Sequence, residues 1–367
     1  MYVLPMIPTG KTPMPPGPAV PFILGNSSPI LFIRPHEPEG RRMTANNIIL
    51  SGMQPTGRLH LGNYEGALKN WVALQNDFEM YCCIVDWHAL TADFENTTDL
   101  PEKIHQMAID YLAAGLNPDK TAVFVQSQVK EHAELHLLFS MIIPIPWLER
   151  VPSSKEKSEE LGLDSYGFLG YPLLQAADIL IYRAGWVPVG KDQVPHIELT
   201  REVARRFNTL YGQVFPEPQA KLTTFAAVPG IDGRKMSKSY GNEISLSMSE
   251  DETRSRLKKM FTDPQKLRKG DPGRPDICPV YDLHKIYTPT YETEISPSCR
   301  TGALGCVDCK MKLADNLNAA LRPVRERRAA LEKDPDAVSR ALKSGAARAR
   351  AKASTTMVEV RRAMRLQ

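Results

Sequence analysis

Residues 48–64 place a strand, a glycine-rich turn and a helix in direct succession, and this segment most constrains the fold. The apolar run 48–50 is typical of a buried strand, and Gly52, Pro55 and Gly57 predict the turn. Apolar residues then recur near the helical period from Leu61 to Leu74. The first N–H groups of a helix are unpaired, and the helix dipole favours negative charge there. The segment therefore predicts a phosphate site, unless the glycines serve only the turn.

A second glycine-rich loop, residues 229–233, leads into Lys235-Met236-Ser237-Lys238-Ser239. Two lysines and two hydroxyl groups suit a mobile loop that closes on a polyphosphate. Near the first motif, His60 and Asn63 add side-chain donors that can reach phosphate oxygens. Together the two motifs indicate an enzyme that binds a nucleotide.

Length and composition set wide bounds. The 367 residues suffice for two domains, and no apolar run reaches the ~18 residues of a membrane span. The net charge of +4 is too small to indicate a nucleic-acid partner by itself. Basic residues nevertheless concentrate in segments 322–328 and 340–365. These segments form either a solvated helical face or a surface that faces RNA.

The first 45 residues are expected to form an N-terminal extension outside the fold. They are rich in proline, lack periodicity, and have none of the features of a secretory signal. Met43 directly precedes the entry into the first strand, so we expect translation to begin there. A disordered tail is the alternative.

Beyond the first helix, strand and helix signals alternate. Further strands are predicted at residues 80–85, 122–126, 186–190 and 222–228, and helices at 100–114, 168–183 and 195–211. Such alternation predicts an α/β fold with a doubly wound parallel sheet, a Rossmann-like nucleotide-binding domain over residues 46–245. From residue 250 the strand signals fade. Helices predicted at 250–261, 280–287, 309–332 and 335–362 indicate a C-terminal all-helical domain, residues 246–367.

One predicted helix carries an unusual carboxylate. Tyr171, Gln175 and Asp178 are spaced i, i+4 and i+7, so they share one helix face. A carboxylate in so apolar a run is costly unless it meets a donor. Asp178 either pairs with Arg183 or Lys191, or forms the single acceptor in a pocket wall.

The two nucleotide motifs resemble the signatures of class I aminoacyl-tRNA synthetases, with His60-Leu61-Gly62-Asn63 as the first and residues 235–239 as the second. Within this class, segments 52–57, 84–90, 176–201 and 305–310 resemble the bacterial-type tryptophanyl-tRNA synthetases. The resemblance covers roughly residues 46–330. Tyrosyl-tRNA synthetases share both signatures but are not expected to carry the 176–201 segment in this form.

The resemblance implies a class I synthetase fold and ATP-dependent ligation of L-tryptophan to tRNA(Trp) through tryptophanyl-adenylate. It implies a cytoplasmic homodimer that uses ATP with Mg²⁺. Catalytic roles are implied for His60, Asn63, Lys235 and Lys238. ATP contacts are implied for Gln54, Pro55, Thr56, Gly62, Asn63, Gly190, Lys191, Asp192, Val228, Lys235, Met236, Ser237, Lys238 and Ser239. Tryptophan contacts are implied for Asp178, as acceptor of the indole N–H, and for Tyr171, Gln175, His88, Val187, Val189 and Gln193.

Two positions depart from the family pattern. Gln175 stands where many relatives have methionine, which alters the polarity expected of the pocket. Lys191 stands where glutamate is common, which alters the charge expected near the ribose. Neither change removes a group that the chemistry needs.

Four cysteines in the helical part, Cys278, Cys299, Cys306 and Cys309, have the spacing C-x20-C-x6-C-x2-C. Four thiolates suit either zinc or a [4Fe–4S] cluster. The family resemblance favours the cluster, since some tryptophanyl-tRNA synthetases carry one at similar spacing. Zinc and unligated thiols remain alternatives.

Two other functions stay open at this stage. The first is an adenylyl-transferring enzyme without a tRNA substrate, and the basic helical region argues against it. The second is a non-catalytic RNA-binding protein. A binding module has no need of His60, Asn63, Lys235 and Lys238, so their presence argues against this reading.

Overall fold

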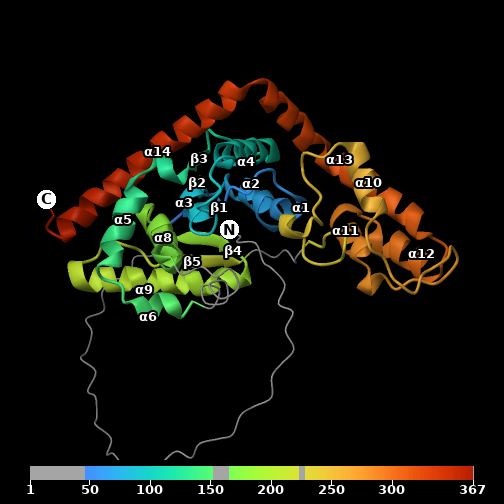
Figure 1. The fold of residues 1–367 in the computed structure, drawn as a ribbon, viewed down its shortest axis with the longest axis horizontal. Coiled ribbons are helices and arrows are strands. Elements are labelled where there is room, and N and C mark those ends of the chain that lie inside the picture. The colour runs from blue at the N-terminus through green and yellow to red at the C-terminus, as the bar shows by residue number, and fades with distance from the viewer. Residues whose placement is uncertain (1–45, 152–164, 223–227, 367) are drawn as a thin grey trace, which may run out of the picture.

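The computed structural model describes residues 46–151, 165–222 and 228–366 (Figure 1). The expected extension 1–45, with the expected start at Met43, lies outside the described residues, as do residues 223–227 of the last predicted strand. Among the helices described, none combines the length and the apolar character that a membrane span requires.

Five parallel strands form one sheet in the order β3-β2-β1-β4-β5. The strands are β1 (Ile48–Met53), β2 (Glu79–Ile84), β3 (Thr121–Val125), β4 (Trp186–Val189) and β5 (Gln219–Leu222). The chain moves outward from β1 to β3 and then returns to the other side of β1 with β4. This reversal confirms the predicted doubly wound sheet. The carboxyl ends of β1 and β4 therefore form the switch point of the sheet, the position at which sheets of this kind bind ligands.

The last strand begins earlier in the chain than predicted. β5 starts at Gln219, three residues before the predicted start, and pairs with β4, while residues 223–227 of the predicted strand lie outside the described residues. As an edge strand it is half-exposed and polar, whereas the prediction followed the apolar residues nearer Val228. Edge strands need only one packed neighbour, so their sequence signal is weak.

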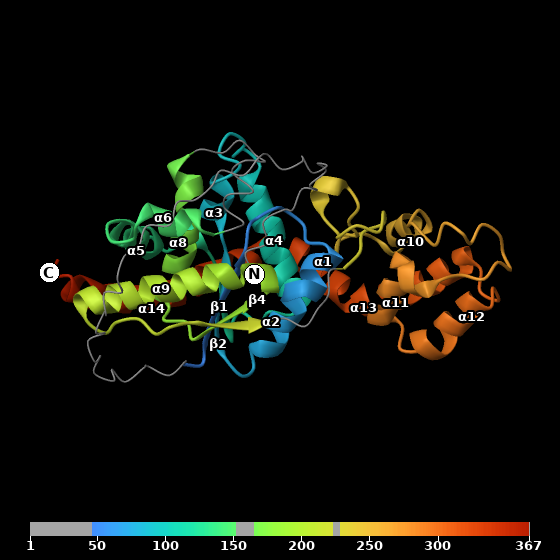
Figure 2. The same ribbon diagram turned by 90° about the horizontal axis from the view of Figure 1, so that it is seen from below.

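Helices cover both faces of the sheet (Figures 1 and 2). The first covering elements are α1 (Leu61–Asn63), the π turn η1 (Tyr64–Leu68), α2 (Lys69–Leu74), α3 (Asp86–Leu90), α4 (Leu100–Ala114), α5 (Glu131–Ser140), α6 (Ile145–Glu149), α8 (Tyr166–Ile181) and α9 (Val194–Tyr211). Successive residues of β1 point to opposite faces of the sheet and enter different cores, as the strand period of two residues requires. Leu50 packs with α5, α8 and α9, whereas Ile49 packs with α2 and α4.

The region after residue 249 is helical, as predicted. It contains α10 (Glu250–Lys258), α11 (Pro279–Tyr287), α12 (Ser296–Arg300), α13 (Cys306–Lys333) and α14 (Pro335–Ala363). Ser249 and Glu252 form a capping box that starts α10. Asp334 caps α14, and Pro335 occupies its first turn. Tyr287 of α11 donates a hydrogen bond to the buried carboxylate of Glu65 at 2.9 Å, so this region packs against η1.

The last helix, α14, returns to the sheet (Figures 1 and 2). Its small residues Gly345, Ala346, Ala349 and Ala353 face the core beside β3. A Cβ on Gly345 would lie 1.9 Å from the backbone oxygen of Val123, so only glycine permits this approach. The domain boundary at residue 246 stays a prediction, but α14 packs with the sheet-bearing part of the chain.

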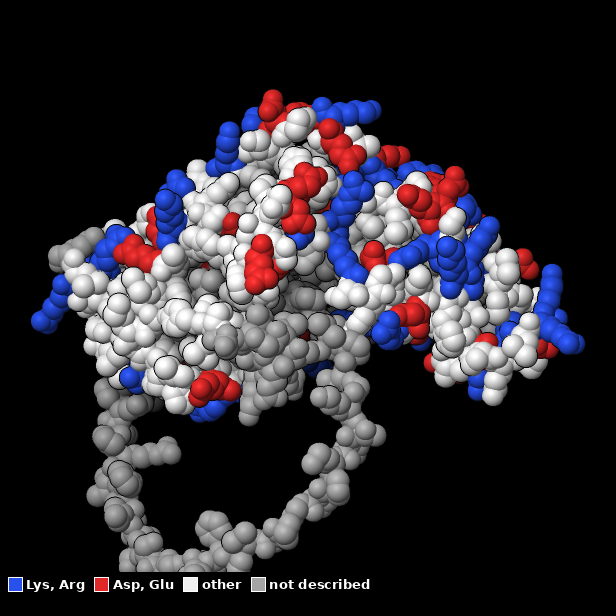
Figure 3. Space-filling view, in the orientation of Figure 1, with Lys and Arg blue, Asp and Glu red and all other residues white. Residues whose placement is uncertain are grey.

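Lys and Arg side chains lie along α13 and α14, together with acidic groups (Figure 3). Several of these arginines hold helices in place. Arg327 donates to the backbone oxygen of Ala113, and Arg361 pairs with Glu134. Arg348 donates to the backbone oxygen of Thr121 at 2.8 Å. Part of the basic character of the tail therefore serves packing within the protein.

Candidate active site

The turn after β1 lies at the switch point of the sheet. Gln54 is buried, and its Nε2 atom donates to the backbone oxygen of His88 at 3.2 Å. The N–H of Thr56 donates to the oxygen of Gln54 at 2.9 Å, which tightens the turn. Gly57 has φ +85°, a left-handed conformation that favours glycine. The turn therefore joins the ends of β1 and β2 and leads directly into α1.

His60 forms the N-cap position of α1 and is buried. Its N–H donates to Oδ1 of Asn63 at 3.2 Å, which fixes the start of the helix. Burial lowers the pKa of His60 to about 4, and the charges of Lys238 and Lys235 add to this effect. The imidazole is therefore neutral at physiological pH. Its buried Nδ1 atom has no hydrogen-bond partner among the described residues.

The lysine loop is held by Asn242, which is buried. Its side chain accepts from the N–H of Ser237 at 2.8 Å and donates to the backbone oxygen of Lys235 at 3.2 Å. It also donates to Asp232 at 2.7 Å. The N–H of buried Met236 donates to the oxygen of Val228 at 2.9 Å. The loop is thus fixed from within, while Lys235 and Ser239 remain exposed.

The two predicted nucleotide motifs meet in the structure. The Nζ atom of Lys238 donates to the backbone oxygen of Thr56 and lies 3.4 Å from its Oγ1 atom. A Cβ on Gly62 would lie 2.9 Å from the ring of His60 and 3.6 Å from Cβ of Met236, so backbone and loop approach closely here. Burial lowers the pKa of Lys238 to about 8, against the opposing charge of Asp110. The fold therefore assembles one cationic site from distant segments.

Asp178 is fully buried and is connected to the turn after β1 through His88, whose backbone oxygen accepts from Gln54 and whose ring contacts the carboxylate. His88 Nε2 lies 2.9 Å from one carboxylate oxygen, and His132 Nδ1 lies 2.6 Å from the other. The Nε2 atom of Gln126 donates to both oxygens at 2.8 Å. The far nitrogen of His132 lies 2.7 Å from the hydroxyl oxygen of Tyr182. Burial alone would raise the pKa of Asp178, but His132 and His88 hold it well below its usual range.

These contacts bear on the alternative that Asp178 forms an ion pair with a basic residue, and they add residues that the sequence did not indicate. Arg183, one proposed ion-pair partner of Asp178, instead donates to Glu359 on α14. Gln126, His132 and Tyr182 were missed. Gln126 follows β3 directly, so its position at the carboxyl end of a parallel strand was the available signal. For His132 and Tyr182, only the tertiary fold shows the contact.

The other residues expected around an amino acid lie on α8, β4 and the start of α9. Tyr171, Val187, Val189 and Gln193 are buried. Gln175 is also buried, and its Nε2 atom has no hydrogen-bond partner among the described residues.

The expected ATP residues after β4 lie at the same edge of the sheet. Gly190 ends the strand, and a Cβ there would lie 2.5 Å from Oδ1 of Asp192. Lys191 and Asp192 are exposed. Pro55 is buried within the turn after β1.

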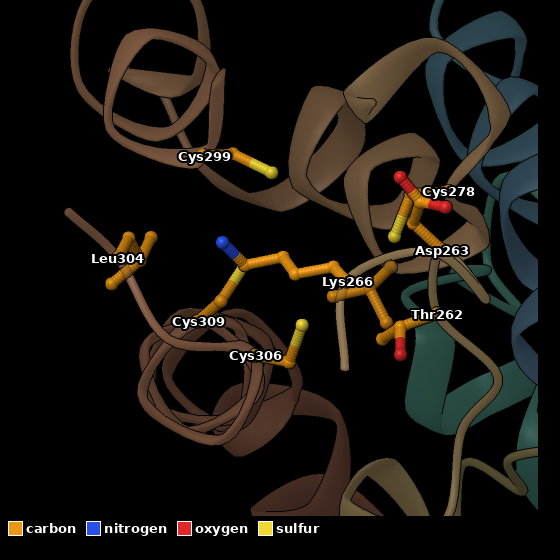
Figure 4. A pocket seen from close by; sticks show the side chains of 9 residues that line it. Thr262, Asp263, Lys266, Cys278, Cys299, Leu304, Cys306 and Cys309 are labelled. Atoms are coloured by element: carbon orange, nitrogen blue, oxygen red, sulfur yellow. The ribbon is translucent and has the colours of Figure 1, made fainter. Parts of the chain in front are cut away.

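The four cysteines of the helical region line one cavity of about 20 Å³. Figure 4 shows the sulfur atoms of Cys278, Cys299 and Cys306 pointing toward a common space, with Lys266 beside them. Burial and the neighbouring thiols raise the pKa of Cys309 to about 12. Among the residues described, however, no three His, Cys, Asp or Glu side chains are grouped closely enough to hold one metal ion.

Comparison with known proteins agrees with this geometry. The family model for class I tRNA synthetases of the tryptophan and tyrosine type matches residues 42–322. The tryptophan–tRNA ligase of Thermotoga maritima is 51% identical over 87% of this chain and 99% of its own. That of Aquifex aeolicus is 44% identical with the same coverage of both chains.

Solved structures show the same relationship. The tryptophanyl-tRNA synthetase of Campylobacter jejuni, in complex with ADP and tryptophan, superimposes with a TM-score of 0.79 at 34% identity. The match covers 86% of this chain and 99% of that one. A tyrosyl-tRNA synthetase from Archaeoglobus fulgidus, at 22% identity and a TM-score of 0.60, shares the fold. The chain therefore belongs to the class I tRNA synthetases of the tryptophan and tyrosine family.

Proposed function

We propose that this chain is a tryptophan–tRNA ligase, which activates L-tryptophan with ATP and transfers it to tRNA(Trp). The observation that carries the proposal is the contact between Lys238 and Thr56, which unites both nucleotide motifs at the switch point of the sheet. The buried carboxylate of Asp178 is connected to the turn after β1 through His88. The names of the bacterial relatives, all tryptophan–tRNA ligases, support the choice of amino acid.

ATP binds between the turn after β1, the end of β4 and the lysine loop. Lys235 and Lys238 hold the phosphates, and His60 donates a hydrogen bond as a neutral imidazole. The unpaired N–H groups at the start of α1 add positive potential. Mg²⁺ neutralises phosphate charge when it is bound with ATP. The residues that contact ATP are those expected from the sequence: Gln54, Pro55, Thr56, Gly62, Asn63, Gly190, Lys191, Asp192, Val228 and residues 235–239.

Tryptophan binds against α8, with its indole ring between β4 and His88. The indole N–H is the only polar side-chain atom of tryptophan and can only donate. The ionised carboxylate of Asp178 is its acceptor, and Val187 and Val189 supply the apolar wall. Gln175 lies one turn before Asp178 on α8, and its buried Nε2 donor, which has no partner among the described residues, suits the amino-acid carboxylate. Tyr171 and Gln193 complete the site.

The reaction needs no nucleophile from the protein. The tryptophan carboxylate attacks the α-phosphorus of ATP, and the bond to pyrophosphate breaks. A ribose hydroxyl of the terminal adenosine of tRNA then attacks the carbonyl carbon, and AMP leaves. The protein acts by positioning the reactants and by stabilising the charge that develops on the phosphates.

The active unit is a cytoplasmic homodimer. Leu137, Met141 and Ile145 on and after α5 expose 54%, 70% and 57% of their surface. Large apolar side chains that share one exposed surface are typical of an interface. None of the six cysteines, all of them described, forms a disulfide, which suits a reducing compartment. The helical region from residue 246 binds the tRNA.

The four cysteines hold a metal group that stabilises this helical region. A single zinc ion requires each sulfur at about 2.3 Å from one centre. The four cysteines line one cavity, and this grouping supports a [4Fe–4S] cluster, with zinc as the alternative. The bound metal would supply positive charge that favours the thiolate form of its ligands.

Amino-acid-dependent ATP–pyrophosphate exchange tests the proposal. The purified chain is assayed with each of the twenty amino acids, and Lys238→Ala is the matched inactive control. Exchange that depends on tryptophan alone supports the proposal. Exchange with tyrosine, or with no amino acid, contradicts it.

A further inference from the structure

A buried pair of charges, Asp110 on α4 and Arg328 on α13, lies directly behind the first nucleotide motif. Asp110 is fully buried and Arg328 is 3% exposed. A guanidinium N–H of Arg328 donates to Oδ1 of Asp110. Arg328 also lies 3.2 Å from Glu332. Arg328 ends the basic segment 322–328 of the sequence, Asp110 belongs to none of the motifs, and the proposed chemistry uses neither residue.

Arg328 donates to two side chains of α4, those of Asp110 and Gln106. Each of these side chains also accepts a hydrogen bond from the turn that precedes α1. Oδ2 of Asp110 accepts the backbone N–H of Leu59 at 2.6 Å. Oε1 of Gln106 accepts from Arg328 and, at 3.3 Å, from Nε of Arg58. Arg328 therefore fixes two side chains that in turn fix Arg58 and Leu59, the residues before His60.

The backbone of Leu59 is held on its other side as well. Its oxygen accepts from the N–H of Leu246 at 2.9 Å and from the hydroxyl of Ser245 at 3.2 Å. Leu59 itself is fully buried. The charge of Asp110 also acts on Lys238 of the lysine loop. The carboxylate of Asp110 thus lies among three parts of the protein: the turn, the loop and α13.

We propose that Asp110 and Arg328 are positioning residues for ATP, through which helix α13 sets the place of His60 and the start of α1. This inference rests on the proposed function, since it assigns the effect to the ATP site of the same enzyme. Transfer of the adenylyl group from ATP depends on the positions of the reacting groups, so a small displacement of the first motif has a large effect on rate. Tryptophan binding, which uses α8 and β4, is not linked to this pair.

The test is ATP–pyrophosphate exchange with Arg328→Met, in which KM for ATP and KM for tryptophan are measured separately. We expect KM for ATP to rise, or kcat to fall, by about ten- to a hundredfold, while KM for tryptophan stays within about twofold. Arg327→Met is the matched control. This neighbouring arginine is exposed and donates to Ala113 on α4, so its loss should leave both constants unchanged.

Arg328→Lys gives a second measure of the same effect. Lysine keeps the charge but cannot reach Asp110 and Gln106 together, so an intermediate KM for ATP is expected. A purely structural arginine would change the melting temperature without separating the two KM values. If Arg328→Met does not fold, Asp110→Asn combined with Arg328→Met replaces it, because this variant leaves no buried charge unpaired.

In an active and folded variant, equal changes in both KM values, or no change in either KM for ATP or kcat, overturn the inference and leave the proposed function intact. A wild-type chain without tryptophan-dependent exchange overturns the proposed function and this inference together.

Discussion

Nδ1 of His132 lies 2.6 Å from Oδ1 of Asp178, and both side chains are fully buried. With His88 and Gln126, this contact keeps the carboxylate of Asp178 ionised in an apolar part of the core. An ionised acceptor is what an indole N–H requires, and a hydrogen bond to a charged group contributes roughly 1.5–3 kcal/mol.

Asp178→Ala should therefore lower kcat/KM for tryptophan by about 10- to 150-fold, the ratio that corresponds to this bond. The measurement is tryptophan-dependent exchange at saturating ATP. Any residual activity with phenylalanine should fall much less, because phenylalanine has no side-chain donor. A variant that activates tryptophan at the normal rate would assign Asp178 a structural role.

Replacing Gln175 by methionine should have opposite effects on stability and binding. In the free protein, the Nε2 atom of Gln175 is buried without a partner, which is unfavourable. Gln175→Met should therefore raise the melting temperature, and it should also raise KM for tryptophan by about 10- to 150-fold through loss of one hydrogen bond to the charged amino-acid carboxylate. An unchanged KM would show that Gln175 does not contact the amino acid.

The activity should depend on pH through Lys238. Burial lowers the pKa of its ammonium group to about 8, so the protonated, charged form predominates below this pH and is lost above it. Since the charged form holds phosphate, kcat/KM for ATP should fall as pH rises through about 8. Lys238→Arg should move this fall to higher pH, because arginine stays protonated. An identical alkaline limb in both proteins would assign it to another group.

Anaerobically purified protein should be brown and contain about four iron atoms per chain. Cys306→Ser should lose the colour and most of the iron. Cys82→Ala, which alters a buried cysteine in β2, should keep both. Iron analysis and visible absorption are the measurements. A colourless protein with one zinc atom per chain would favour the alternative.

The sequence predicted the sheet, because each strand except β5 carries a continuous apolar run bounded by turns. It also located both nucleotide motifs and the face of α8 that bears Asp178, since these depend on local spacing. The position of α14 was not predictable in this way. Its alanines and Gly345 pack on β3, but a stripe of small residues does not identify its partner in advance.

The partners of Asp178 and the pair Asp110–Arg328 show the same limit. His132, Tyr182 and Arg328 belong to segments whose contacts arise only when the chain is folded. A buried arginine within a basic helix has no local signal. Local spacing thus located the two nucleotide motifs, whereas the residues that hold these motifs in place are seen only in the fold.

Charging of tRNA is the most direct measure of the central claim. The purified chain is incubated with ATP, Mg²⁺ and radiolabelled amino acid, together with transcripts of tRNA(Trp) or tRNA(Tyr). The account predicts that tryptophan is attached to tRNA(Trp) and that tyrosine is attached to neither transcript. Attachment of tyrosine to tRNA(Tyr), or tryptophan activation without any charging of tRNA(Trp), would contradict it.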